Sequence, residues 1–151
     1  KLNPIIPADR RLQALQSCMQ QISIERAHGH VVLRNDSGAL LQREEEEVVA
    51  EVAEHILRLR YTGDNPEQQK ELSRRAAGTL PATISRHLER AKKLEESNDL
   101  SGVFTHFSAH DNTLMALLAH MGFKDFPVPK FGAFLVFELH KDGAGEWIVR
   151  D

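Results

Sequence analysis

Cysteine is almost absent from this sequence. Cys18 is the only one among 151 residues, so the chain can form no internal disulfide and contains no cysteine-rich metal cluster. A single cysteine favours an intracellular setting, since small secreted domains often depend on disulfides. With 41% hydrophobic and 27% charged residues, the composition is that of one ordinary globular domain or a piece of one.

A basic excess and long apolar runs are also missing. The chain has 19 Lys and Arg against 22 Asp and Glu, a net charge of −3. A general nucleic-acid binder concentrates positive charge on one face, so we expect no nucleic-acid partner. No stretch reaches the roughly 18 apolar residues that a membrane span needs, and no charged-then-apolar leader precedes the first helical pattern. The sequence therefore predicts neither a membrane span nor a signal peptide.

Helical patterns occupy most of the chain. Apolar residues recur at helical spacing, an acidic run from Glu44 to Glu47 suits a helix start, and Pro66 and Pro81 suit first-turn positions. These signals predict helices at residues 12–22, 43–61, 66–75, 80–94 and 112–121.

Strand patterns lie mainly in the last third of the chain, and residues 30–33 are a further candidate for a short strand. Residues 103–107 and 133–140 are apolar runs, and a Gly-containing turn at residues 141–145 leads to a final strand that ends near Arg150. Because residues 133–140 are almost continuously apolar, we expect that strand to be covered on both faces.

The junction between the first of these strands and the last helix is the most informative part of the sequence. His110 and Asp111 lie there, at a predicted helix start whose N–H groups and positive dipole end suit an anion. An imidazole and a carboxylate at that place can handle both a charge and a proton. The alternative is that Asp111 only caps the helix by accepting backbone N–H groups.

The motif at this junction resembles a known family. Residues 105–114 read Thr-His-Phe-Ser-Ala-His-Asp-Asn-Thr-Leu and residues 134–139 read Phe-Leu-Val-Phe-Glu-Leu, and a helix begins near residues 78–80. This order and spacing resemble the carboxyl-terminal part of the histidine acid phosphatases. The resemblance implies an α/β fold with a central, mostly parallel sheet covered by helices. Residues 78–151 would belong to that core, and residues 1–77 would form an additional helical region that caps it or covers the sheet.

The resemblance also implies a reaction, namely phosphomonoester hydrolysis through a phosphohistidine, without a metal or other cofactor. His110 would contact the transferred phosphoryl group and Asp111 would protonate the leaving oxygen. The expected substrate is a phosphorylated small molecule. These roles agree with the chemistry, because phosphoryl transfer spreads charge over oxygens and an alkoxide leaving group needs an acid.

The nucleophile motif of that family, Arg-His-Gly-x-Arg-x-Pro, is missing. The nearest string, residues 26–30, has an alanine before His28, lacks the following arginine and proline, and follows a helical pattern. We therefore expect this chain to be the later part of a longer polypeptide whose missing amino-terminal part supplies the nucleophile. By the resemblance, a secreted or lysosomal location is an alternative to the intracellular one. A homodimer is also left open.

Two other functions remain open for the His-Asp pair. In metal-dependent phosphohydrolases such a pair binds ions within an all-helical domain, together with further histidines and an aspartate. The predicted strand before His110 speaks against that class. The second alternative is a non-catalytic, phosphate-binding pseudophosphatase module that has lost the nucleophile.

Overall fold

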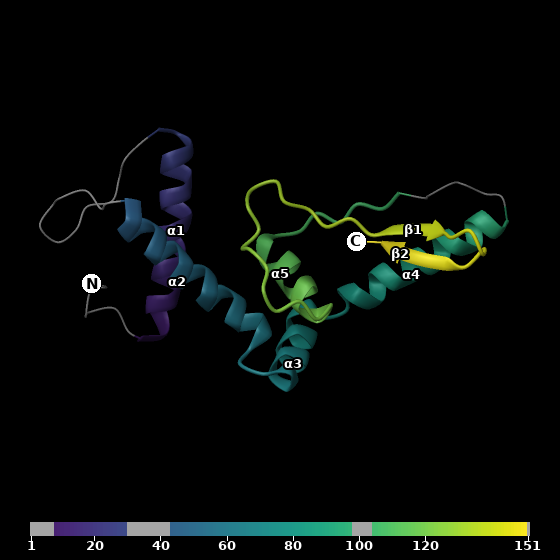
Figure 1. Ribbon diagram of the computed structural model, residues 1–151, viewed down its shortest axis with the longest axis horizontal. Helices are drawn as coiled ribbons and strands as arrows, with labels where there is room; N and C mark the ends of the chain where they lie inside the picture. The colour runs from purple at the N-terminus through teal and green to yellow at the C-terminus, as the bar shows by residue number, and fades with distance from the viewer. Residues whose placement is uncertain (1–7, 30–42, 98–103, 151) are drawn as a thin grey trace, which may run out of the picture. The chain divides into compact units, whose positions relative to one another are not determined.

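The computed structural model describes residues 8–29, 43–97 and 104–150 (Figure 1). All five predicted helices are confirmed in these ranges, and the first extends beyond its apolar repeat at both ends. Two short strands follow them. The elements are α1 (Ala8–Ala27), α2 (Arg43–Thr62), α3 (Pro66–Ala77), α4 (Leu80–Glu96), α5 (Asp111–His120), β1 (Glu138–Lys141) and β2 (Trp147–Arg150).

The chain divides into two compact units, Lys1–Arg60 and Tyr61–Asp151. In the first unit, Arg26 near the end of α1 forms an ion pair with Glu46 in the first turn of α2. Each charge also suits its helix end, because a cation near a carboxyl end and an anion near an amino end both oppose the helix dipole. Ile22 and Leu57 are among the buried apolar residues of this unit.

Helix α3, in the second unit, begins and ends where its sequence directs. The Asn65 side chain accepts a hydrogen bond from the Gln68 amide at 2.9 Å, and Pro66 occupies the first turn, where it costs no helical hydrogen bond. At the other end, Gly78 adopts a positive φ of 57° and its amide donates to the Arg74 carbonyl at 3.1 Å. A glycine is suited to this position because a side chain would strain it.

The core of the second unit lies between α3 and α5. Figure 1 shows the two helices next to each other. Helix α5 buries Met115, Ala116, Leu117 and Ala119, and α3 buries Gln69, Ser73 and Ala77. The small Ala and Ser side chains among them allow a close approach of the two helix backbones.

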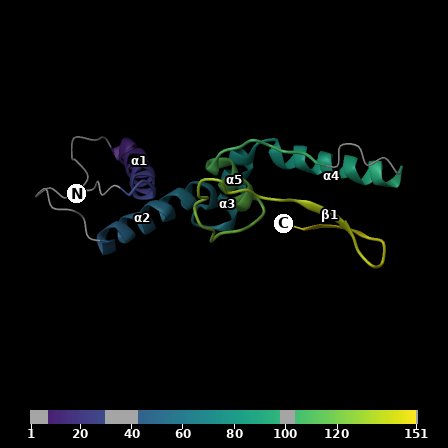
Figure 2. The same ribbon diagram turned by 90° about the horizontal axis from the view of Figure 1, so that it is seen from above.

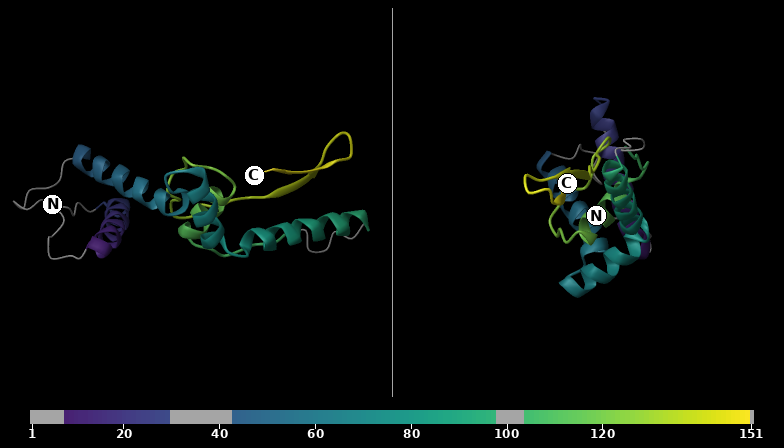
Figure 3. Two further views of the ribbon diagram at one scale, coloured as in Figure 1. Left: turned by 90° about the horizontal axis from the view of Figure 1, so that it is seen from below. Right: turned by 90° about the vertical axis from the view of Figure 1, so that its right-hand side faces the viewer.

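The predicted hairpin is confirmed. Strands β1 and β2 pair antiparallel, with Glu138 opposite Arg150 and Lys141 opposite Trp147. The Asp142 side chain closes the turn by accepting the amides of Ala144 and Glu146, each at 2.8 Å. The hairpin and α4 extend in the same direction from the α3 and α5 pair (Figures 2 and 3).

Lys141 joins the hairpin to α4. Its ammonium group lies 3.6 Å from the Glu95 carboxylate and 5.1 Å from the centre of the Trp147 ring. Both contacts are at the surface, so each contributes little to the stability of the fold.

The predicted central parallel sheet is wrong. The described residues contain one sheet, the antiparallel β1 and β2 hairpin, and are otherwise mainly helical. Residues 104–110 have no regular secondary structure, and residue 103 lies outside the described ranges. A parallel strand needs a hydrogen-bonded neighbour reached through a crossover connection, and the described segments provide none for this run.

The second predicted strand is only partly formed, since residues 133–137 are irregular and β1 begins at Glu138. It is also not covered on both faces. Phe134 is 78% exposed and Phe104, in the other apolar run, is 86% exposed. The apolar runs therefore predicted strands at these segments, but an apolar run does not show whether another segment will pair with it and bury it.

Candidate functional site

His110 and Asp111 lie at the amino end of α5. The helix begins at Asp111, and His110 is the residue before it, with an extended backbone (φ −111°, ψ 165°). The His110 carbonyl accepts the amides of Thr113 at 2.9 Å and Leu114 at 3.2 Å. Its imidazole forms no capping hydrogen bond and is exposed, so the ring is accessible to a ligand.

The Asp111 carboxylate is half-buried and has a local contact. Its Oδ1 accepts the backbone amide of Asn112 at 2.7 Å. It is not the contact that the capping alternative requires, because the cap position is His110 and a cap side chain accepts the second or third amide of the helix, whereas Asp111 is the first helical residue and accepts the next amide. It does not use the full capacity of the group, because a carboxylate has two oxygens and several acceptor positions. The contact is therefore compatible with a helix-start role and with a second role toward a ligand.

Asn112 connects this pair to a distant part of the unit. The hydroxyl group of Tyr61, at the end of α2, donates to Asn112 Oδ1 at 2.9 Å across 51 residues of sequence. The Tyr61 side chain is buried, with 9% of the residue exposed. Tyr61 could not be predicted as part of this site, because a single tyrosine at the end of an apolar helical pattern is indistinguishable from a core residue.

The carboxyl end of α5 is held by another side chain that the sequence analysis did not find. Gln69 Nε2 donates to the carbonyl oxygens of Ala119 and Phe123, each at 2.9 Å, and Gln69 is 5% exposed. The last carbonyl groups of a helix have no partner within the helix. The Ala119 carbonyl also accepts the Gly122 amide at 3.1 Å, so Gln69 is its second donor, whereas Gln69 gives the Phe123 carbonyl, beyond the helix, a donor from α3. Helix α5 is thus fixed near its start by Tyr61 and at its end by Gln69.

The segment leading to His110 contacts α4. Thr105 Oγ1 and His87 Nδ1 are 3.3 Å apart, and the His87 and Phe107 rings meet edge to face with centres 5.5 Å apart. These contacts are exposed, as is His106 between them. His87 therefore supports the irregular segment that replaces the predicted strand.

His28, the weak nucleophile candidate, lies in the first compact unit. It directly follows α1, and its amide donates to the carbonyls of Ile24 and Glu25, each at 3.2 Å. Its helical surroundings agree with the pattern noted in the sequence and differ from the strand on which the family's motif would lie. His30 lies outside the described residues.

In residues 8–29, 43–97 and 104–150, no three His, Cys, Asp or Glu side chains converge as a metal ligand set. None of the described helices combines the length and the apolar character needed to cross a membrane. The strand expected before His110 is absent, however, so the setting of the pair no longer speaks against the all-helical, metal-dependent class.

Comparison of the chain with protein-family models, with curated proteins and with solved structures finds no match. The resemblance to the histidine acid phosphatases therefore depends on the motif around His110 and Asp111 and on the apolar run after it.

Proposed function

We propose that this chain supplies the acid half of a phosphomonoester hydrolase site that acts on a phosphorylated small molecule. The observation that carries the proposal is the placement of His110 and Asp111 side by side at the start of α5, with an imidazole that no capping bond occupies. The ten-residue α5 adds a positive dipole end at the same place, which favours a phosphate group.

Each of the two side chains has a distinct task in this reaction. The His110 ring donates an N–H to a phosphoryl oxygen and stabilises the negative charge on it. A histidine nucleophile attacks phosphorus as the bond from phosphorus to the ester oxygen breaks, and Asp111 gives its proton to that leaving oxygen. Water then attacks the phosphohistidine, Asp111 takes a proton from that water, and inorganic phosphate and the free histidine are released.

The nucleophile must come from residues outside these 151, since the sequence contains no Arg-His-Gly-x-Arg-x-Pro motif. We therefore expect no measurable turnover of a model phosphate ester by this chain alone. Inorganic phosphate should still bind at the start of α5. The first experiment is an NMR titration of the isotope-labelled chain with inorganic phosphate, in which the resonances of His110 and Asn112 should move and those of the hairpin should not. Unmoved resonances at the start of α5 would contradict the proposal.

The absence of that motif also favours one competing function, a phosphate-binding module without catalysis. The sequence and activity of the longer polypeptide that the catalytic proposal requires distinguish the two functions. An Arg-His-Gly motif upstream, together with turnover of phosphate esters that a chelator does not reduce, supports the hydrolase. Phosphate binding with another residue in place of the motif's histidine supports the binding module. Turnover that a chelator abolishes would support the metal-dependent class.

A further inference from the structure

We infer that Tyr61 is a positioning residue for the His110 and Asp111 pair and acts through Asn112. This inference concerns the site of the proposed function, but the contact on which it depends is independent of any ligand. Two hydrogen bonds meet at Asn112. The Tyr61 hydroxyl donates to Asn112 Oδ1 at 2.9 Å, and the backbone amide of Asn112 donates to Asp111 Oδ1 at 2.7 Å.

The residue between the two bonds is one that would otherwise interfere with the helix start. Asparagine side chains commonly turn back onto nearby backbone groups, which is why they are frequent in caps and turns. In this structure the Asn112 acceptor oxygen is occupied by a hydroxyl group from another helix. The Asn112 side chain is thereby kept away from the backbone amides of the first turn, and the backbone amide of Asn112 remains the partner of Asp111.

The two partners differ in burial. Tyr61 is buried while Asn112 is exposed, so the Tyr61 hydroxyl group is held in place by its surroundings, and the Asn112 side chain is the group that would otherwise move. The remaining donor group of Asn112, its side-chain NH2, is not needed for the bond to Tyr61. Tyr61 therefore holds the side chain of Asn112, which is two residues after His110 in the sequence, on the turn where the phosphate is proposed to bind.

The first test needs no ligand. In Tyr61→Phe, which removes one oxygen atom, the exchange rate of the Asn112 backbone amide with solvent should rise by about three- to tenfold, the equivalent of one ordinary hydrogen bond. The matched control is Gln69→Met, which loosens the opposite end of the same helix. It should raise exchange at the carboxyl end of α5 and leave the Asn112 amide unchanged.

The second test adds inorganic phosphate. Tyr61→Phe should weaken phosphate binding by about three- to tenfold, and the double variant Tyr61→Phe with Asn112→Ala should bind no more weakly than Asn112→Ala alone, because the two residues act in series. Gln69→Met should bind phosphate as the wild type does.

The outcomes separate this inference from the proposed function. Unchanged Asn112 exchange in Tyr61→Phe overturns the positioning role, whether or not phosphate binds. Faster Asn112 exchange in Gln69→Met, equal to that in Tyr61→Phe, also overturns it, because the effect would then be a general loosening of α5. A third outcome is that Asn112 exchange is faster in Tyr61→Phe alone, while phosphate does not move the α5 resonances of the wild type. That outcome supports the positioning role and refutes the proposed function.

Discussion

Gln69 Nε2 donates to the carbonyl oxygen of Phe123 and to that of Ala119, each at 2.9 Å. The buried side-chain amide of Gln69 on α3 thus binds both the last turn of α5 and the segment that follows this helix. We expect Gln69→Leu to lower the free energy of unfolding by about 1–3 kcal/mol, because two hydrogen bonds, each worth about 0.5–1.5 kcal/mol, are lost. Urea unfolding followed by circular dichroism measures this.

The neighbouring glutamine provides the control for that experiment. Gln68 is exposed, and its Oε1 accepts the backbone amide of Asp64 at 2.8 Å. Water can replace Gln68 as the partner of that exposed amide. Gln68→Leu should change the free energy of unfolding by at most about 0.5 kcal/mol. Equal losses in the two variants would show that the Gln69 bonds contribute nothing beyond those of a surface side chain.

The second prediction concerns Met115, which is 1% exposed and is the largest almost fully buried side chain among the residues that the structure describes. Met115→Ala should lower the free energy of unfolding by about 2–5 kcal/mol, because the truncation leaves a cavity between α3 and α5. Met121→Ala, at a residue that is 39% exposed, should cost less than about 1 kcal/mol. A small loss at Met115 would mean that the helices close the gap, or that this contact is absent in solution.

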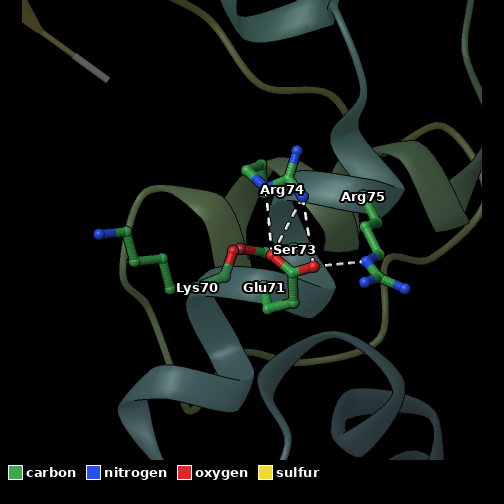
Figure 4. A network of polar contacts seen from close by, with 5 residues as sticks. All are labelled: Lys70, Glu71, Ser73, Arg74 and Arg75. Carbon is green, nitrogen blue, oxygen red and sulfur yellow. Dashed lines mark hydrogen bonds and ion pairs between the residues drawn. The ribbon is translucent and has the colours of Figure 1, made fainter.

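The third prediction concerns pH. The Arg75 and Arg74 guanidinium groups donate to the Glu71 carboxylate, Arg75 Nε at 2.6 Å and Arg74 Nη2 at 3.1 Å, and hold the pKa of Glu71 below its ordinary value. Figure 4 shows both arginines directed at this carboxylate and Lys70 extending away from it. Since protonation is harder in the folded state, this contribution to stability is complete above the ordinary glutamate pKa and disappears as pH falls through the lowered one.

Glu71→Gln tests this prediction through its urea midpoint. The variant should unfold at slightly lower urea than the wild type near pH 7, and the difference should vanish in acid and shrink in high salt, because the pair is exposed. Glu67→Gln, one turn earlier on α3, is the control for removal of a charge without these partners. A difference that persists unchanged in acid would rule out the ion pairs as its cause.

Local signals gave the helices and failed for the sheet. The start of α3 was predictable because Asn65 and Pro66 act on the backbone within a few residues of themselves. The β1 and β2 hairpin was predictable for the same reason, since Asp142 closes its turn locally. A parallel sheet depends on partners far away in the sequence, and the apolar run at residues 104–107 contains no information on whether such a partner is present.

The candidate site divides in the same way. His110 and Asp111 are neighbours in the sequence, so their closeness follows from the chain itself, and a helical pattern after them predicted the start of α5. Tyr61 and Gln69 lie about 50 residues from their partners, at 51 residues from Asn112 and 50 from Ala119. Only tertiary packing brings them to α5, and no spacing rule connects residues at that separation.

The final prediction concerns the role of Asp111 in the longer polypeptide that the proposed hydrolase requires. Asp111→Asn keeps an acceptor for the Asn112 amide, so the start of α5 should survive, but it removes the proton that the leaving oxygen needs. For an alkyl phosphate, a poor leaving group, kcat should fall by about 10²–10⁴. For an activated aryl phosphate, whose oxygen leaves as a stable anion, it should fall far less. Asp125→Asn, just beyond α5, should leave both rates unchanged. Equal losses of kcat for both substrates in Asp111→Asn would remove Asp111 as the acid and leave it as a residue that only begins the helix.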